Sequence, residues 1–319
     1  MTIKKFIVSA IILLHSSLLA AGETFDFIVL GDTAYTGDSY VEYERLIDRI
    51  NIDKPDFAIH VGDTLGYQPC SNESYDRIDG FFGRFKAPLV YTPGDNEWTD
   101  CDEPGSDAKA MGDWDAVADY RLNRLAELRL RYFSTDKSLG QRKIMLNRQS
   151  EYGKEEHRRF VENAYWIHGD VLFATAHITG SSDGFHPHIP RQAMESIDRR
   201  HANYAWIMRM AGIAEEQGVK AIVLAVHGDM FERAEKSPYD SPFSGTKIRG
   251  GNLGPYVGYI HALSVLSRKF PKPILLVHGD AHRFVIDRPM MMKGDEDQPD
   301  KLRYQNLTRL QVFGAPEIR

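Results

Sequence analysis

Acidic and histidine side chains follow five apolar segments of the chain, each at the point where a β-strand is expected to end. The segments read IVLGDT, IHVGDT, VYTPGDNE, LAVHGD and LLVHGDAH. Ligands of open α/β sheets converge at the carboxyl ends of the strands. Six oxygen and nitrogen donors there can hold two divalent or trivalent cations and leave positions open for water and substrate. The sequence therefore predicts a dinuclear metal site and hydrolytic chemistry, with the donors Asp32, Asp63, Asp95, His227, Asp280 and His282.

These five blocks resemble, in the same order, the blocks of the calcineurin-like metallophosphoesterases. In that family they run approximately D-x-H or D-x-G, GD, GNH[ED], a strand ending in His, and GHxH. Here they span Gly31 to His282, which is nearly the whole chain after its first residues. The resemblance implies an α/β fold, a four-layer α-β-β-α sandwich with two mixed sheets. It also implies hydrolysis of a small phosphorylated substrate, a phosphomonoester or phosphodiester, by metal-activated hydroxide.

The resemblance also assigns roles to the six donors. Asp63 would bridge the two cations, because each oxygen of a carboxylate can take one metal. Two cations about 3.5 to 4 Å apart lower the pKa of a shared water and offset charge on the attacking and leaving groups. The other ligands would divide into Asp32 and His282 for the first cation and Asp95, His227 and Asp280 for the second.

The third block, GDNE, departs from the family pattern. Asn96 stands where the family keeps its His, and an amide cannot be a general acid. Asn96 would then position phosphate, or the enzyme would use leaving groups that need little protonation, or another group would supply the proton. His177, His186 and His188 are candidates for that group. The residues expected to act in catalysis are Asn96, Asp63 and His227.

Two further departures concern the metals. Asp95 and Asp280 put carboxylates where the family has neutral ligands, which favours Mn, Mg or Fe over Zn. In the purple acid phosphatase branch a Tyr after the second block binds iron. Tyr67 follows Asp63 by four residues instead of three, so Tyr67 and Tyr35 are either metal ligands or aromatic residues at the rim.

Several polar residues lie in or near the five blocks, but the resemblance assigns them no role. His278 and His60 are expected either to orient ligands or to pack in the core. The candidates for substrate contacts are His186, His188, Arg249 and Arg283.

Two other readings of the chain remain open. One is a non-catalytic, metal-binding member of the same fold, because Asn96 removes the usual acid. The other is a GDS-type serine esterase, because residues 37–39 spell that motif. Its placement argues against it, since the nucleophile of that family directly follows the first strand, whereas Ser39 is expected to be the N-cap of the next helix.

The elements that must position these residues alternate between apolar runs and helical periodicity. Strands are predicted over residues 25–30, 57–61, 89–91, 164–168, 171–178, 221–226, 274–277 and 307–313. Helices are predicted over residues 41–50, 75–85, 113–132, 191–217 and 256–270. Residues 134–160 are expected to form a substrate-facing flap, and residues 237–255 a mobile loop at the mouth of the site.

Composition and the first residues bear on location. Residues 1–22 have two lysines, an apolar stretch and terminal small residues, the pattern of a signal peptide, with residues 23–319 as one metallophosphoesterase domain. A periplasmic or secreted protein with no membrane span in its mature form follows. Cys70 and Cys101 are expected to form a disulfide in preference to two free thiols. The net charge of −6 argues against nucleic acid as a partner, and a monomer is expected.

Overall fold

The computed structural model describes residues 24–66, 70–152, 154–231, 254–290 and 304–316. The strands are β1 (Phe27–Leu30), β2 (Phe57–His60), β3 (Leu89–Tyr91), β4 (Asn147–Arg148), β5 (Ala164–His168), β6 (Val171–Thr175), β7 (Ala221–Ala225), β8 (Ile274–His278), β9 (Val285–Asp287) and β10 (Leu307–Gln311). The helices are α1 (Gly37–Asp53), α2 (Asn72–Arg84), α3 (Ala108–Met111), α4 (Trp114–Tyr132), α5 (Gly180–Asp183), α6 (Pro190–Glu216) and α7 (Gly254–Lys269), with 3₁₀ turns at Gln149–Glu151 and Glu155–His157.

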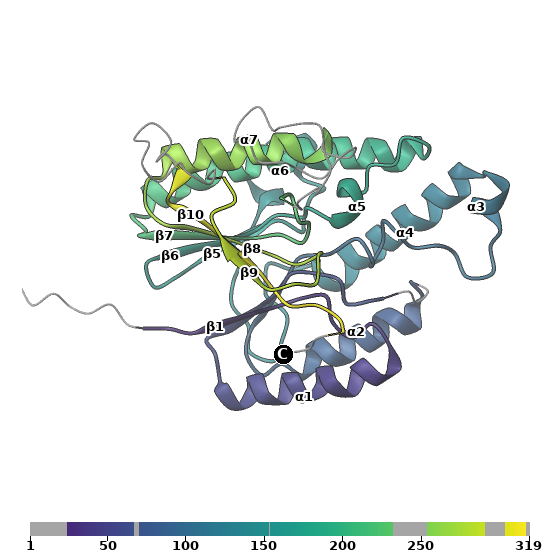
Figure 1. Cartoon of the computed structure of the whole chain (residues 1–319), viewed down its shortest axis with the longest axis horizontal. Coiled ribbons are helices and arrows are strands. Elements are labelled where there is room, and N and C mark those ends of the chain that lie inside the picture. The colour runs from purple at the N-terminus through teal and green to yellow at the C-terminus, as the bar shows by residue number, and fades with distance from the viewer. Residues whose placement is uncertain (1–23, 67–69, 153, 232–253, 291–303, 317–319) are drawn as a thin grey trace, which may run out of the picture.

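Two sheets form the two central layers of the fold. The smaller has the order β1-β2-β3, and the larger has the order β4-β5-β6-β7-β8-β10-β9. Helices α6 and α7 lie over the larger sheet, and α1 and α2 lie under the smaller one (Figure 1). The expected four-layer α-β-β-α sandwich is therefore confirmed. The expectation of two mixed sheets is wrong for the smaller sheet, whose described strands are all parallel, because α1 and α2 provide the crossovers that parallel neighbours require.

Alternation along the strands separates the buried side chains into three layers of core. In β2, Phe57 and Ile59 face the larger sheet, whereas Ala58 faces the helices under the smaller sheet. In β6, Phe173 packs between the sheets, and Leu172 packs against the side that α6 and α7 cover. Successive strand residues point to opposite faces, so a run that is apolar at every position serves two cores at once.

The long elements match the sequence predictions to within a few residues, but the segment after α4 does not. Leu139 exchanges backbone hydrogen bonds with Leu89 at the start of β3, and Gln141 N–H donates to the Phe85 carbonyl. The segment then adds β4 to the edge of the larger sheet by pairing with β5. Its first part thus packs at the amino end of β3, opposite to the carboxyl ends that carry the donors. The expectation of a substrate-facing flap over residues 134–160 is wrong for that part.

Two predicted features fall outside the described residues, namely the signal peptide over residues 1–22 and most of the loop over residues 237–255. Within the described ranges, no helix is long and apolar enough to cross a membrane.

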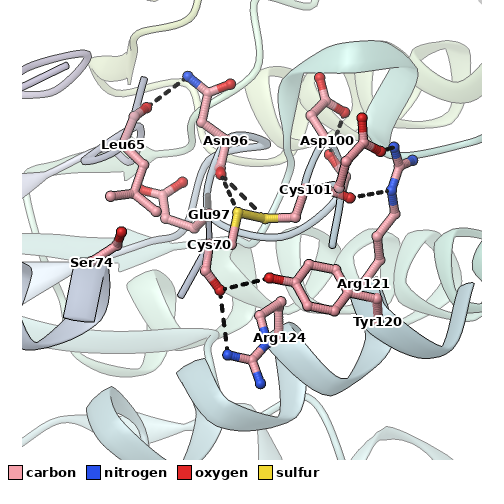
Figure 2. Close-up of a disulfide and its surroundings, with 12 residues drawn as sticks. Leu65, Cys70, Ser74, Asn96, Glu97, Asp100, Cys101, Tyr120, Arg121 and Arg124 are labelled. Atoms are coloured by element: carbon pink, nitrogen blue, oxygen red, sulfur yellow. Dashed lines mark hydrogen bonds and ion pairs between the residues drawn. A yellow bond between two sulfur atoms is a disulfide. The ribbon is translucent and has the colours of Figure 1, made fainter. Parts of the chain in front are cut away.

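A disulfide joins Cys70 and Cys101, as the sequence predicted. Cys70 directly precedes the N-cap of α2, and Cys101 follows the third block; their Cα atoms are 5.8 Å apart. Figure 2 shows side chains of α4 around this bridge. The Tyr120 hydroxyl donates to the Cys70 carbonyl at 3.1 Å, and Arg121 Nε donates to the Cys101 carbonyl at 2.8 Å. The bridge and α4 together fix the loops that follow β2 and β3.

Loss of this disulfide is expected to destabilise the fold. The cysteines are 31 residues apart, and closing a loop of that size constrains the unfolded chain by about 3 to 4 kcal/mol in the chain-entropy model. The Cys70→Ser/Cys101→Ser double variant should therefore lose about that much free energy of unfolding, measured by urea denaturation. Reductant should produce a similar loss in the wild type and none in the double variant. Equal stability of the oxidised wild type and the double variant would contradict this.

Candidate metal centre

The six predicted donors follow five strands and lie at one end of the sandwich. Asp32, Asp63 and Asp95 follow β1, β2 and β3, while His227 follows β7 and the remaining pair follows β8. Among the described residues, two groups have ligand atoms that all lie within 4.8 Å of one another. They are Asp32 with Asp63 and His227, and Asp95 with His227 and Asp280. We call the residues of these two groups together with His282 the metal cluster. Donors from both sheets thus meet across the sandwich.

His227 is oriented as a metal ligand would be. Its Nδ1 lies 2.8 Å from the Val61 carbonyl, which can only accept, so Nδ1 carries the hydrogen. Nε2 is therefore the free lone-pair nitrogen, 2.9 Å from Asp95 Oδ1 and 3.4 Å from Asp63 Oδ1. Both Nε2 and Asp95 Oδ1 are buried, and at this distance the two atoms must share either a proton or a cation. A proton on Nε2 satisfies the pair in the metal-free protein, and a cation can take its place, so this set of atoms fits a metal ion.

His282 is held in the same way, and Tyr35 lies beside it. The Nδ1 of His282 donates to the Ala315 carbonyl at 2.8 Å, which leaves Nε2 facing Asp32 Oδ1 at 3.6 Å. The Tyr35 hydroxyl is 3.1 Å from that Nε2 and donates to Asp63 Oδ2 at 3.0 Å. Tyr35 thus lies in the metal cluster, where it can either ligate a cation or orient the two ligands. Tyr67 lies outside the described residues.

The backbone of the cluster is in a costly conformation. The φ angles of Asp32, Asp63, Asp280 and His282 are 52°, 54°, 76° and 55°. The left-handed region costs a non-glycine residue on the order of 1 kcal/mol or more and persists where the surroundings require it. Here it aims the side chains at one another. The Asp280 N–H also donates to both oxygens of Asp32, at 2.9 and 3.1 Å. Four strained residues in the three turns that follow β1, β2 and β8 point to a function that selects them.

The carboxylates of the cluster are buried close to one another, where water cannot offset their charges. Burial raises the pKa of Asp63 well above its ordinary value and that of Asp32 to about 6. Burial and the charge of Asp95 raise the pKa of Asp280 to about 7. Burial opposes charge on His227, but the surrounding carboxylates outweigh it and raise its pKa well above the ordinary value. The protein alone does not neutralise this cluster, and bound cations would.

A short turn at α5 completes one side of the cluster. Ser181 Oγ lies 2.8 Å from Asp95 Oδ2 and 2.6 Å from Asp100 Oδ2. A hydroxyl has one hydrogen, so it can donate to only one of these carboxylates at a time. Three successive non-glycine residues in this turn, 181–183, have positive φ values of 46°, 60° and 57°. Contacts from neighbouring elements must therefore stabilise the conformation of this turn.

A buried ionic network supplies that support. Arg199 of α6 pairs with the carboxylate of Asp183, and its Nη2 donates to the Asp183 carbonyl at 2.8 Å. Arg199 Nη1 also donates to the His177 carbonyl at 3.0 Å, and the Tyr259 hydroxyl donates to Asp183 Oδ2 at 2.8 Å. The side chains of Arg199 and Asp183 are both fully buried. A buried pair needs this many hydrogen bonds to offset its desolvation.

Breaking this pair is expected to cost much more than breaking an exposed one. Arg199→Met leaves the Asp183 carboxylate buried without its partner, so we expect a loss of about 3 to 5 kcal/mol in the free energy of unfolding. Arg49→Met is the matched control, since Arg49 is also helical and its ion pair with Asp53 is exposed. That variant should lose less than about 1 kcal/mol. Denaturation curves of both variants provide the measurement, and similar losses in the two would contradict the role assigned to Arg199.

The structure places Asn96 beside Asp63, the residue expected to bridge the cations. Its backbone N–H donates to Asp63 Oδ1 at 3.1 Å, and its side-chain amide donates to the Leu65 carbonyl at 2.8 Å. Figure 2 shows the amide turned toward Leu65. Asn96 thus orients Asp63 through its main chain.

His177 is not available as a general acid, contrary to one of the sequence-based alternatives. It is buried, with Nδ1 3.0 Å from Glu162 Oε1, and its Nε2 accepts a hydrogen bond from Trp98 Nε1 at 3.2 Å. Both ring nitrogens therefore have partners, and the residue belongs to the supporting network.

His60 and His278 lie in the core behind the cluster. His60 Nδ1 accepts from the Gly62 N–H at 3.2 Å, in the turn that presents Asp63, and its ring contacts those of Tyr43 and Phe82. Burial lowers the pKa of His60 to about 3 and that of His278 to about 4, so both are neutral. His278 Nε2 is 3.9 Å from Asp229 Oδ1, and the Asp229 N–H donates to Asp280 Oδ2 at 2.8 Å.

The candidates for substrate contacts are dispersed. His186 Nε2 is 4.0 Å from Asp100 Oδ1, on the side of the cluster that Ser181 occupies. His188 is exposed, with its ring 6.5 Å from that of Trp114. Arg283 Nη2 is 3.9 Å from Asp229 Oδ2. Arg249 lies outside the described residues.

Two residues of the site were missed from the sequence. Glu97 is fully buried and joins the second and third blocks, since it accepts from the Thr64 N–H at 2.7 Å and from the Gly94 N–H at 2.9 Å. Its place in the GDNE block could have indicated this. Ser181 carries no such signal, because only the fold brings the loop after β6 to Asp95.

Comparisons with known proteins give distant structural likenesses. No family model matches the chain, and no curated protein does. The structure is similar to that of a dimetal phosphatase from Danio rerio, with a TM-score of 0.48, 7% sequence identity, and coverage of 90% of this chain and 87% of that one. It is also similar to GAP50, the anchor in the inner membrane complex of Plasmodium, with a TM-score of 0.46, 12% identity, and coverage of 90% of this chain and 70% of that one.

Proposed function

We propose that this chain hydrolyses phosphomonoesters or phosphodiesters with two divalent or trivalent cations held by the metal cluster. The observation that carries the proposal is the convergence of buried carboxylates on one imidazole nitrogen, since His227 Nε2 lies 2.9 Å from Asp95 Oδ1 and 3.4 Å from Asp63 Oδ1. Buried carboxylates this close to one another disfavour their charged forms unless protons or cations offset the charge. The carboxylates around them supply oxygen ligands, which suit Mn, Mg or Fe.

The side chains of the metal cluster would have different roles. Asp63 contacts both His227 and Tyr35 and would bridge the cations. Asp32 and His282 would complete one position, and Asp95, His227 and Asp280 the other. Bound cations would lower the pKa of a water and offset charge on the phosphoryl oxygens. The Asn96 N–H holds one oxygen of Asp63, and Tyr35 holds the other, so this carboxylate is oriented before any metal binds.

Metal content and turnover test the proposal together. The purified protein would be analysed by inductively coupled plasma mass spectrometry and assayed with p-nitrophenyl phosphate and bis-p-nitrophenyl phosphate under added Mn²⁺, Fe²⁺ or Zn²⁺. About two metals per chain with metal-dependent turnover would support it. Two metals without turnover of either ester class would favour a non-catalytic metal-binding protein. A protein that binds no metal would refute it.

The serine esterase alternative has no support in the described structure. Ser39 is the third residue of α1, and its hydroxyl donates to the Thr36 carbonyl at 2.8 Å and accepts from the Thr36 N–H. Ser39 therefore takes part in a capping box whose N-cap is Thr36, and the expectation that Ser39 itself is the N-cap is wrong. Chelators should abolish turnover, and serine-directed phosphonates should leave it unchanged.

We infer that the protein is exported and acts as a monomer of one catalytic domain over residues 23–319. The Cys70–Cys101 disulfide supports an oxidising compartment. Fractionation of cells that express the full chain, with amino-terminal sequencing of the product, tests cleavage after the first 22 residues. Recovery of the uncleaved chain with the cytosolic fraction would refute export.

A further inference from the structure

The turn that follows β7 carries one proposed metal ligand and holds a second. Asp229 lies two residues after His227, and its backbone N–H donates to Asp280 Oδ2 at 2.8 Å. The Asp229 side chain is fully buried, and its Oδ1 accepts from the Phe231 N–H at 2.9 Å. A carboxylate that accepts from the N–H two residues on closes an Asx turn and restrains the local backbone. The position of the Asp229 N–H therefore depends on where its side chain is held.

The two oxygens of Asp280 have separate surroundings. Oδ2 accepts from the Asp229 N–H, whereas Oδ1 and Asp95 Oδ1 would both lie within 2.6 Å of a Cβ atom at Gly180. Oδ1 therefore faces Asp95, which belongs to the same group of the metal cluster. Because Asp229 holds one oxygen, the other is turned toward the place where a cation would bind.

Arg309 of β10 holds the Asp229 side chain. Its Nη1 donates to Asp229 Oδ1 at 3.4 Å, while Nε and Nη2 donate to the two oxygens of Asp287 in β9 at 2.8 and 2.6 Å. Two parallel hydrogen bonds of this kind fix the plane of a guanidinium. The Arg309 side chain is 5% exposed, and its Cζ lies 5.8 Å from the centre of the Phe231 ring. Asp287 thus orients a buried guanidinium whose remaining nitrogen contacts Asp229.

Among the described residues, Arg309 makes the closest ion pair with Asp229. Arg283 Nη2 is 3.9 Å from Asp229 Oδ2, and its side chain is half exposed. His278 Nε2 is 3.9 Å from Asp229 Oδ1 and carries no hydrogen, because Nδ1 donates to the Gly279 carbonyl. A buried carboxylate that loses its partner is strongly destabilised. Loss of Arg309 would therefore drive the Asp229 side chain out of its turn and release the N–H that holds the ligand oxygen.

On the basis of the proposed function, we propose that Arg309 is a positioning residue for the cation at Asp95, His227 and Asp280. It acts through Asp229 and touches no ligand itself. The guanidinium holds the carboxylate of Asp229, the carboxylate restrains the turn, and the N–H of the turn holds Asp280 Oδ2. The edge of the larger sheet thereby sets the orientation of a proposed metal ligand.

The sign of the change in metal affinity distinguishes this role from a simple effect of charge. Removing the positive charge of Arg309 would by itself strengthen the binding of a nearby cation. Loss of a group that orients a ligand has the opposite effect. Arg309→Met should therefore lower Mn²⁺ affinity at this position about 10- to 100-fold, measured by isothermal titration. The position that Asp32 and His282 complete should keep its wild-type affinity.

Electron paramagnetic resonance provides a second readout, since two neighbouring Mn²⁺ ions are magnetically coupled and a single ion is not. At a Mn²⁺ concentration that just fills both positions of the wild type, Arg309→Met should give the spectrum of isolated ions.

Arg148→Met is the matched control. Arg148 is also a buried arginine in a strand of the larger sheet, and it donates to the Thr135 and Val161 carbonyls. That variant should lose stability against urea and keep wild-type Mn²⁺ affinity. Asp287→Asn is the second variant, in case Arg309→Met does not fold. It keeps the charge of Arg309 but weakens its anchor, so it should weaken the same metal position by a smaller factor.

Circular dichroism checks that each variant is folded under the conditions of the titration. Unchanged or tighter Mn²⁺ binding in folded Arg309→Met, equal losses at both positions, or an equal loss in Arg148→Met would overturn the positioning role. If Arg309→Met is unfolded, unchanged binding in Asp287→Asn overturns it. A wild type that binds two metals but hydrolyses neither ester refutes the proposed function and leaves the role of Arg309 to the same titration. A wild type that binds no metal refutes both.

Discussion

Asp63→Asn is expected to lower phosphoester turnover on the order of 10³-fold or more and to reduce bound metal below two per chain. The amide keeps the shape of the carboxylate, but its nitrogen cannot ligate, so the proposed bridge between the cations is lost. A cation that polarises a phosphoryl oxygen stabilises the transition state by several kcal/mol, and about 4 kcal/mol corresponds to three powers of ten in rate. The position permits the change sterically, because Asn and Asp have nearly the same volume.

Asp38→Asn is the control for this substitution. Asp38 is exposed near the start of α1, and the same chemical change there should leave rate and metal content at wild-type values. Metal content by mass spectrometry and initial rates with p-nitrophenyl esters, taken on the same preparations, provide the comparison. A variant of Asp63 that retains two metals and full turnover would show that this carboxylate does not bridge.

Gly180→Ala is expected to empty or distort the proposed metal position at Asp95, His227 and Asp280 while leaving the fold intact. A Cβ atom at Gly180 would lie 2.5 Å from Asp95 Oδ1 and 2.6 Å from Asp280 Oδ1. Contacts that short are not tolerated, so the turn or the two carboxylates must move. Displacing groups that orient metal ligands typically costs 10- to 100-fold in metal affinity, and here two proposed ligands are displaced at once. We therefore expect a loss of about 100-fold in affinity for the more weakly held cation, measured by isothermal titration with Mn²⁺.

Gly212→Ala separates this effect from the general cost of replacing glycine. Gly212 lies within α6, and a Cβ there meets nothing within 4 Å. Alanine is the better helix former, so that variant should be as stable as the wild type or up to about 1 kcal/mol more stable. Its metal affinity should not change. Unaltered metal affinity in Gly180→Ala would show that the turn at α5 does not border a metal position.

The sequence predicted the ends of the strands well because two independent patterns coincide there. Each of the five strands that precede a donor is a run of mostly apolar residues followed by Gly and an acid or His, and parallel strands must place those ends on one edge. Asp32, Asp63 and Asp95 meet for this reason. The same argument identified His227 and, after β8, Asp280 and His282. An apolar run does not, however, indicate which sheet its strand joins.

The remaining features depend on contacts between distant segments, which no local pattern records. Ser181 reaches Asp95 across 86 positions of the chain, and its turn is held by Arg199 of the following helix. The segment from 134 to 148 looks polar and irregular in sequence, yet its backbone groups pair with Leu89 and with β5. The sequence left His177 as a candidate for catalysis, and only the fold shows that Glu162 and Trp98 occupy its two ring nitrogens.

The placement of the donors on both sheets has a mechanical consequence. Each of the two groups of ligands combines a residue from the smaller sheet with one from the larger: Asp32 and Asp63 with His227, and Asp95 with His227 and Asp280. A bound cation would therefore act as a cross-link between the two halves of the molecule. Separating the sheets would require releasing the ion, and mass action would make resistance to unfolding rise with the concentration of free metal. The ions of the proposed reaction would then also determine how long the folded protein persists where metal is scarce.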